Sequence, residues 1–169
     1  MTGATITFDL DDLGVLADLD QIAARGEDLF PLMDAIGRVL VNGARERIAS
    51  TNVDPDGVPW PQSFRAEVFG GPTLRATGAL LESINARPEE RQVRVGSNLI
   101  YAGVHQEGAI IRAKTAGGLL FMLADGEEVV VSEVTVPRRA YLGISEGERE
   151  DIADLTVAFY SGLLGGEMH

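Results

Sequence analysis

The chain has 169 residues, a formal net charge of −12 at pH 7 and no cysteine. This length accommodates one domain with a hydrophobic core, and the lack of cysteine excludes disulfides, thiolate zinc sites and thiol nucleophiles. The excess of acidic residues argues against a basic nucleic-acid-binding surface. The apolar runs are too short to span a membrane, and the first residues do not resemble a secretory signal.

The acidic residues are concentrated in two stretches of the chain. Residues 1–34 carry eight carboxylates against one cation, and residues 126–154 carry eight against three. This uneven distribution indicates either a surface that binds other proteins or a surface that lines a space in which negative charge is favourable. Asp9, Asp11 and Asp12 lack the spacing of an EF-hand, so a solvated acidic face is preferred there over a calcium site.

The N-terminal region is predicted to form a strand and a short helix. Ala4–Asp9 alternates threonine with isoleucine and phenylalanine, as in a strand with one buried face. Asp11 or Asp12 is expected to cap a helix that runs to about Arg25.

The strongest helical pattern runs from residue 27 to about residue 50. Apolar residues recur there at three- and four-residue spacing, which is the period of an amphipathic helix. Glu27 and Asp28 near its start, and Arg45 and Arg47 near its end, complement the helix dipole.

The middle of the chain predicts shorter elements. Residues 52–61 are rich in turn-forming residues and end the long helix. Residues 62–73 have no clear pattern, and Gly70-Gly71-Pro72 closes that stretch as a loop. Thr77 is expected to cap one helical turn. Residues 83–87 and 92–96 are expected to pair as a hairpin.

The next segment predicts a helix and then three strands. Asn98 is expected to cap a short helix that continues to Gln106. Residues 109–114, 119–123 and 128–136 then have the composition of strands, and an Asp-Gly turn signal separates the last two.

The chain is predicted to end in an amphipathic helix. Ser145 and Glu148 have the spacing of a capping box at its start. Its apolar stripe is formed by Ile152, Leu155, Phe159 and Leu163.

These elements predict one α+β domain over residues 1–169. An antiparallel sheet is expected to pack against the long helix and the C-terminal helix. Residues 1–26 form an acidic N-terminal strand and helix, residues 27–164 a core, and residues 165–169 a loose tail. Residues 109–136 are expected to project as a β-hairpin, because a two-stranded arm needs an external partner to bury its second face.

The sequence offers few candidates for catalytic or metal-binding residues. His169 ends the sequence, and His105 is either a general base or metal ligand, or a half-buried histidine bonded to the backbone. The second interpretation is preferred because a zinc site needs more nitrogen or sulfur ligands than this chain supplies. No phosphate loop, dinucleotide fingerprint or nucleophile elbow is present, so no catalytic, metal or cofactor-binding residue is predicted.

Trp60 is the only tryptophan and lies between two prolines. A core anchor that fastens an irregular loop is the preferred interpretation. An interface anchor is the alternative, since tryptophan is enriched in interface hot spots.

Four short motifs occur in a fixed order along the chain. They are GVPWPQ at residues 57–62, LRATGALLESI at 74–84, VRVGSNLIYAGVHQEG at 93–108 and VPRRAYLGIS at 136–145, followed by the last helix. Together they resemble the virion morphogenesis, or tail completion, family of Mu-like and P2-like bacteriophages. The resemblance runs from about Asp34 to the C-terminus, and the acidic N-terminal stretch is not part of the pattern.

The resemblance implies a structural protein rather than an enzyme, located in the virion at the neck or tail end and in the host cytoplasm during assembly. It implies a homo-oligomeric ring, with six copies expected, that contacts the tail tube and head–tail connector proteins. DNA is expected to pass through the lumen without specific binding, which suits a negative net charge. No membrane or cofactor is implied.

Two sets of residues follow as hypotheses. The packed centre is expected to contain Leu74, Leu80, Leu81, Ile84, Tyr101, Val104, Tyr141 and Leu142. Subunit or tail contacts are expected at Trp60, Lys114, Leu119, Phe121, Arg138 and Arg139. The two arginines form either a solvated pair or an inter-subunit ion pair with the acidic N-terminal face.

Two other classes of function remain open from the sequence. One is an acidic adaptor or binding module that engages a basic partner as a monomer or dimer. The other is a hydrolase that uses His105 with a nearby carboxylate.

Overall fold

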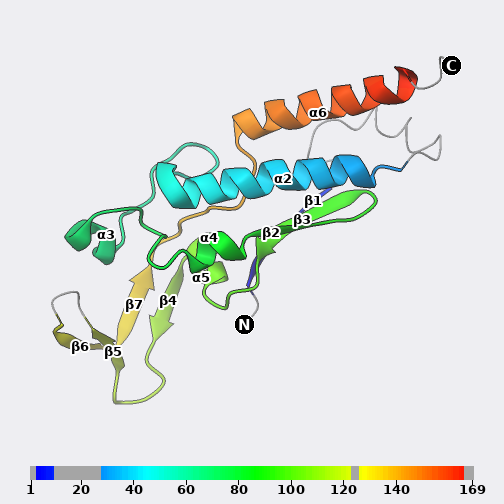
Figure 1. Cartoon of the computed structure of the whole chain (residues 1–169). Coiled ribbons are helices and arrows are strands. Elements are labelled where there is room, and N and C mark those ends of the chain that lie inside the picture. The colour runs from blue at the N-terminus through cyan, green and yellow to red at the C-terminus, as the bar shows by residue number, and fades with distance from the viewer. Residues whose placement is uncertain (1–2, 10–27, 123–125, 166–169) are drawn as a thin grey trace.

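Figure 1 shows a computed structural model of the protein, which describes residues 3–9, 28–122 and 126–165. The elements in chain order are β1 (Ala4–Asp9), α2 (Phe30–Glu46) with a π-helical turn (Arg47–Thr51), α3 (Phe64–Phe69), α4 (Ala79–Ser83), β2 (Asn85–Pro88), β3 (Gln92–Ser97), α5 (Ala102–Glu107), β4 (Ala109–Arg112), β5 (Leu119–Met122), β6 (Glu128–Val131), β7 (Glu133–Val136) and α6 (Glu146–Gly165). The predicted α+β class, with a long helix, a C-terminal helix and small antiparallel sheets, is confirmed.

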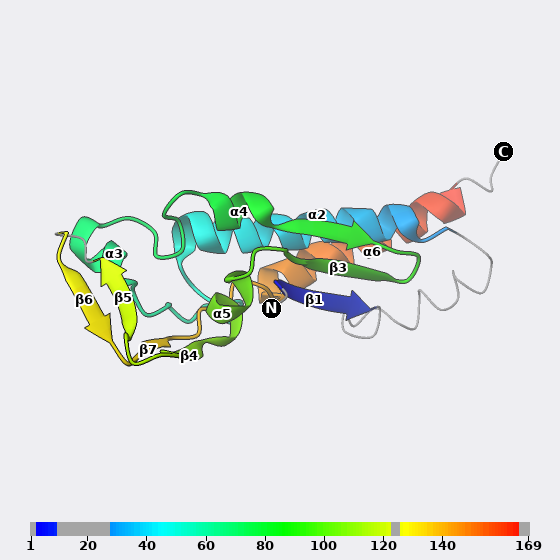
Figure 2. The ribbon, with the colours of Figure 1, turned by 90° about the horizontal axis from the view of Figure 1, so that it is seen from below.

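The long helix α2 forms the middle layer of the molecule. It packs against the sheet β1-β3-β2 on one side and against α6 on the other (Figures 1 and 2). Leu32, Met33, Ile36 and Leu40 of α2 are fully buried, and each contributes roughly 1.5–3 kcal/mol by leaving water. Gly37 lets the sheet approach closely, since a Cβ there would lie 2.9 Å from the Cβ of Ala86.

The predicted strand Ala4–Asp9 and the hairpin of β2 and β3 are confirmed, and they form one antiparallel sheet in the order β1-β3-β2. Phe8 lies opposite Val93, and Ile6 lies opposite Val95, so their side chains share the face that meets α2. Val93 and Val95 are buried there. The sheet therefore closes the core on this side of the long helix.

The long helix differs from its prediction at both ends. It begins at Phe30, where the Asp28 carboxylate accepts the Phe30 N–H at 3.0 Å. Instead of running regularly to residue 50, it widens into the π-helical turn, and Asn52 closes that turn in a left-handed conformation with φ 53°. The helix predicted to end at about Arg25 lies outside the described residues.

In the middle of the chain, one helix was not predicted and another begins later than predicted. Residues 62–73, which have no clear sequence pattern, contain the helix α3, and the Ser63 hydroxyl caps it by accepting the Ala66 N–H at 3.2 Å. The helix α5 begins at Ala102 rather than directly after Asn98. It continues to Glu107, one residue past the predicted end at Gln106, and Gly108 caps it.

Residues 109–136, hereafter the arm, project from one end of the molecule (Figure 2). The arm consists of two antiparallel ladders, β4 with β7 near the body and β5 with β6 beyond it. The predicted single strand over residues 128–136 is interrupted at Ser132, whose carbonyl accepts the Ala113 N–H at 2.8 Å. The arm therefore has a proximal and a distal segment.

The last helix has the predicted capping box. The Ser145 N–H donates to Glu148 Oε2 at 2.6 Å, and the Glu148 N–H donates to the Ser145 hydroxyl at 3.3 Å. Ile152 is buried, whereas Leu155 and Phe159 are partly buried against the core. The side chain of Leu163 lies outside the description, and the helix includes Gly165, which was predicted to belong to the tail.

Candidate functional site

Segments of the sequence motifs converge on residues 139–143, an extended stretch before α6. Trp60 Nε1 donates to the Ala140 carbonyl at 3.2 Å. The Gln106 side-chain oxygen accepts the backbone N–H groups of Tyr141 and Leu142 at 3.1 and 3.0 Å, and its nitrogen donates to the Leu142 carbonyl. The first, third and fourth motifs are thus joined by buried polar bonds, which fix one backbone geometry.

Tyr141 is the centre of this arrangement. Its side chain is fully buried, and its hydroxyl donates to the Ala102 carbonyl at 3.1 Å. Burial, with a smaller effect of Tyr101, raises the pKa of Tyr141 well above its usual value, so the hydroxyl stays protonated. The residue therefore acts as a neutral packing and bonding element.

The structure agrees with the preferred interpretation of Trp60, a core anchor, and contradicts a solvated Arg139. Trp60 is buried in the hydrophobic core. Arg139 is 5% exposed, and it donates to the carbonyls of Pro61 and Gln62 at 2.7 and 3.1 Å. Arg139 is thus fixed by bonds within the subunit and lines a pocket, whereas the neighbouring Arg138 is exposed.

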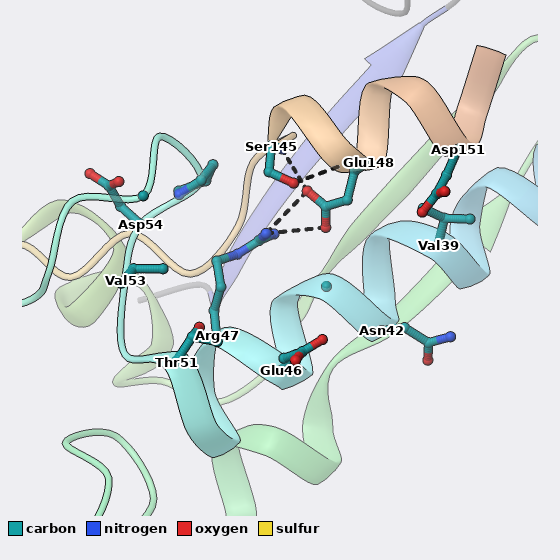
Figure 3. A pocket seen from close by; sticks show the side chains of 13 residues that line it. Val39, Asn42, Glu46, Arg47, Thr51, Val53, Asp54, Ser145, Glu148 and Asp151 are labelled. Carbon is teal, nitrogen blue, oxygen red and sulfur yellow. Dashed lines mark hydrogen bonds and ion pairs between the residues drawn. The ribbon is translucent and has the colours of Figure 1, made fainter. Parts of the chain in front are cut away.

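A cleft of about 480 Å³ lies between the end of α2, the loop that follows it and the start of α6 (Figure 3). Arg47 and Glu148 form a buried ion pair in its wall, with Nη1 at 3.1 Å from each carboxylate oxygen. Arg47 also donates to the carbonyls of Tyr141 and Gly143 at 2.9 and 3.2 Å. Because these two charges neutralise each other, the residues of the cleft are better explained as a contact that holds α6 on α2 than as a ligand site.

A smaller pocket of about 190 Å³ lies between α4, α5 and the Arg139 side chain. His105 lines it, and its Nδ1 is buried without a hydrogen-bond partner in the described part of the chain. Burial, and then the charge of Arg139, lowers the pKa of His105 below its ordinary value. Among the described residues there is no cluster of three or more potential metal ligands, so no ligand set surrounds this histidine there.

The distal segment of the arm is apolar on both faces. Leu120 lies opposite Val130, and these side chains are 62% and 59% exposed. On the other face, Leu119 lies opposite Val131, and both are partly exposed. A two-stranded ribbon has no interior in which to bury either face, so these aliphatic side chains stay accessible to water in the single subunit.

The predicted core residues separate into three groups. The buried ones are Leu80, Ile84, Tyr141 and Leu142, and the partly buried ones are Leu74, Leu81 and Val104. Tyr101 was wrongly placed in the core, because its side chain is 43% exposed. Its ring instead meets that of His105 edge-on, with centroids 6.1 Å apart.

The remaining predicted interface residues lie on or near the arm. Lys114 is exposed at the bend, and Leu119 is partly exposed. The side chain of Phe121 lies outside the description. Sequence reasoning missed the exposed apolar residues of α3, which are Phe64, Val68 and Phe69.

A model of the phage virion morphogenesis family matches residues 10–159. The chain therefore belongs to the phage virion morphogenesis family, which is a family of structural and assembly proteins associated with the virion. The match begins well before Asp34 and takes in much of the acidic N-terminal stretch, which the four motifs had left out. Neither a curated protein nor a solved structure matched the chain. In the described ranges, no helix combines the length and the apolarity that crossing a bilayer requires.

Proposed function

We propose that this protein is a structural component of the phage neck or tail end, which completes the tail and joins it to the head as a homo-oligomeric ring of about six copies. Its neighbours would be the tail tube and the head–tail connector proteins, and DNA would pass through the lumen without specific binding. It accelerates no reaction. Family membership supports the assembly role in general, and the shape of the subunit supports this particular version.

The observation that carries the proposal is the apolar distal segment of the arm. Exposed Leu120 and Val130 lie on strands that extend beyond the body. Exposed aliphatic surface on an extended hairpin is typical of a segment that is buried by another subunit. A contact between the arm of one copy and a different surface of the next copy is heterologous, and such contacts generate rings when the rotation closes.

The proposal is tested with the double variant Leu120→Asp/Val130→Asp. Light scattering is expected to detect an assembly of the natural chain and a monomer of the variant, with unchanged circular dichroism, because the arm packs mainly on itself. Val157→Asp, which alters an equally exposed residue of α6, serves as the matched control. In phage lacking the natural protein, the arm variant should leave full heads and unattached tails in electron micrographs.

The main alternative is an acidic adaptor that acts as a monomer or dimer. It predicts that the arm variant assembles like the natural chain and that complemented phage show joined heads and tails. That pair of results would exclude the ring. It would favour instead a search for a basic partner bound by the acidic surface.

A further inference from the structure

The pocket between α4 and α5 is lined by Arg139 and Tyr101, among other residues. Tyr101 and its neighbour in sequence, Ile100, expose apolar surface just before α5. Its volume of about 190 Å³ is smaller than the roughly 300–1,000 Å³ of small-molecule sites. The pocket is therefore suited to a single side chain of a protein partner.

Arg139 carries a buried charge that no carboxylate of the described residues pairs. Its bonds to Pro61 and Gln62 use two of the five donors of a guanidinium, and both acceptors are neutral carbonyls. Among the ion pairs of the described residues, none joins a carboxylate to Arg139. Burying a charge is costly unless it is paired, so a carboxylate that reaches the pocket from outside would be stabilised there.

The distal segment of the arm presents a surface of complementary character. Glu128 lies opposite Met122 in the β5–β6 ladder, two residues from Val130 on its strand. Because side chains alternate along a strand, Glu128 shares a face with Val130 and Leu120. All three side chains are exposed. One face of the arm thus offers a carboxylate at its end and aliphatic groups behind it.

We propose that the distal arm of one subunit docks on the pocket of the next subunit, with Glu128 directed at Arg139 and the Leu120–Val130 pair against Ile100 and Tyr101. This inference deepens the proposed ring by naming its contact. The partner is a second copy of this chain. The two surfaces are complementary, because each places a charge of opposite sign beside exposed apolar side chains. The distal segment also projects beyond α4 and α5 (Figure 2).

The contact also explains an exposed residue in a sequence motif. Tyr101 and Gln106 belong to the same YAGVHQEG segment. Gln106 is buried and bonded inside the subunit, whereas the ring of Tyr101 is exposed beside the pocket. A rim position makes Tyr101 available to a neighbour, and tyrosine is a common anchor in protein interfaces.

Cross-linking tests the contact directly, because the natural chain has no cysteine. Ala76→Cys places a thiol at the exposed mouth of the pocket, and Glu128→Cys places one on the arm. When the two variants are mixed with a short bismaleimide reagent, a covalent dimer of the mixed pair is expected. Ala76→Cys mixed with Asp154→Cys, an exposed site on α6, is the control. A mixed product no more abundant than the control product would overturn the proposal, whatever the oligomeric state.

Two surface variants give a second readout without disturbing Arg139. Ala76→Trp, which fills the mouth of the pocket, and Glu128→Lys, which reverses the charge, should each weaken association by about tenfold or more in light scattering. Tyr101→Ala should act in the same direction and keep the circular dichroism of the natural chain. If Leu120→Asp/Val130→Asp abolishes the ring while these three variants do not weaken it, this contact is wrong and the ring stands. If no variant affects assembly or the joining of heads to tails, the proposed function is itself wrong.

Discussion

Arg47 and Glu148 lie 101 positions apart in the sequence, and their side chains form a buried ion pair with both carboxylate oxygens 3.1 Å from Arg47 Nη1. The pair joins the π-helical turn after α2 to the first turn of α6. Glu148 also accepts the Ser145 N–H, so one carboxylate serves both the capping box and the ion pair. The position of α6 on α2 therefore depends on this contact (Figure 3).

Replacing Glu148 by Gln should destabilise the protein strongly. The amide keeps the shape of the side chain but leaves the Arg47 charge buried without a counter-ion, and breaking a buried pair in this way costs about 3–5 kcal/mol. Chemical denaturation gives the free energy of unfolding of the variant and of Glu150→Gln, an exposed acid on the same helix. The control should change by less than about 0.5 kcal/mol. Equal losses in the two variants would contradict a structural role for the pair.

Gly43 should not tolerate alanine, although alanine is the better helix former. In an open helix interior, Gly→Ala gains up to about 1 kcal/mol. At Gly43, however, the added Cβ would overlap the Glu148 carboxylate, which displaces it from Arg47. The expected result is a net loss of stability of about 2 kcal/mol or more, because the loss of the ion pair exceeds the propensity gain.

Two comparisons isolate the cause of that loss. Gly162→Ala on α6 has no atom of the described residues within 4 Å of its new Cβ and should be neutral or stabilising when measured by thermal denaturation. In a Glu148→Ala background, Gly43→Ala should cost far less than in the natural chain, since the obstructing carboxylate is gone. Additive effects of the two substitutions would show that the clash does not act through Glu148.

Local patterns predicted much of the architecture. The alternation in Ala4–Asp9, the hairpin of β2 and β3 and the Ser145–Glu148 capping box depend on residues that are near each other in sequence, and the structure contains all three. Helix boundaries were predicted less well. The π-helical turn begins at Arg47, which bonds to the segment before α6, and no local period reveals such long-range bonds.

The burial of individual motif residues required tertiary information. Tyr101 and Tyr141 are both aromatic residues in motif segments, yet one is 43% exposed and the other is fully buried. The difference depends on a long-range contact, because the Tyr141 hydroxyl donates to the carbonyl of Ala102, which lies 39 residues away in the sequence. The burial of Arg139 was not predicted for a similar reason, since its acceptors are carbonyls of the loop that holds Trp60. The helix α3 was missed because its apolar residues face outward rather than forming a buried stripe.

Stability should depend on pH through His105. Its pKa is lowered from 6.5 in the folded state, first by burial and then by the charge of Arg139, so the unfolded chain binds the proton more readily. His105 therefore leaves the free energy of unfolding undiminished above pH 6.5. As the pH decreases below 6.5, its titration lowers that free energy by up to about 1.4 kcal/mol per pH unit, until the folded-state pKa of His105 is reached. His105→Gln removes this titration, so its free energy of unfolding should fall less steeply between pH 6.5 and 5 in urea titrations. Carboxylates titrate in both proteins, and the difference between the two slopes isolates the histidine. Parallel slopes would mean that His105 binds its proton equally well in the folded and unfolded chains, and that neither its burial nor Arg139 opposes the imidazolium.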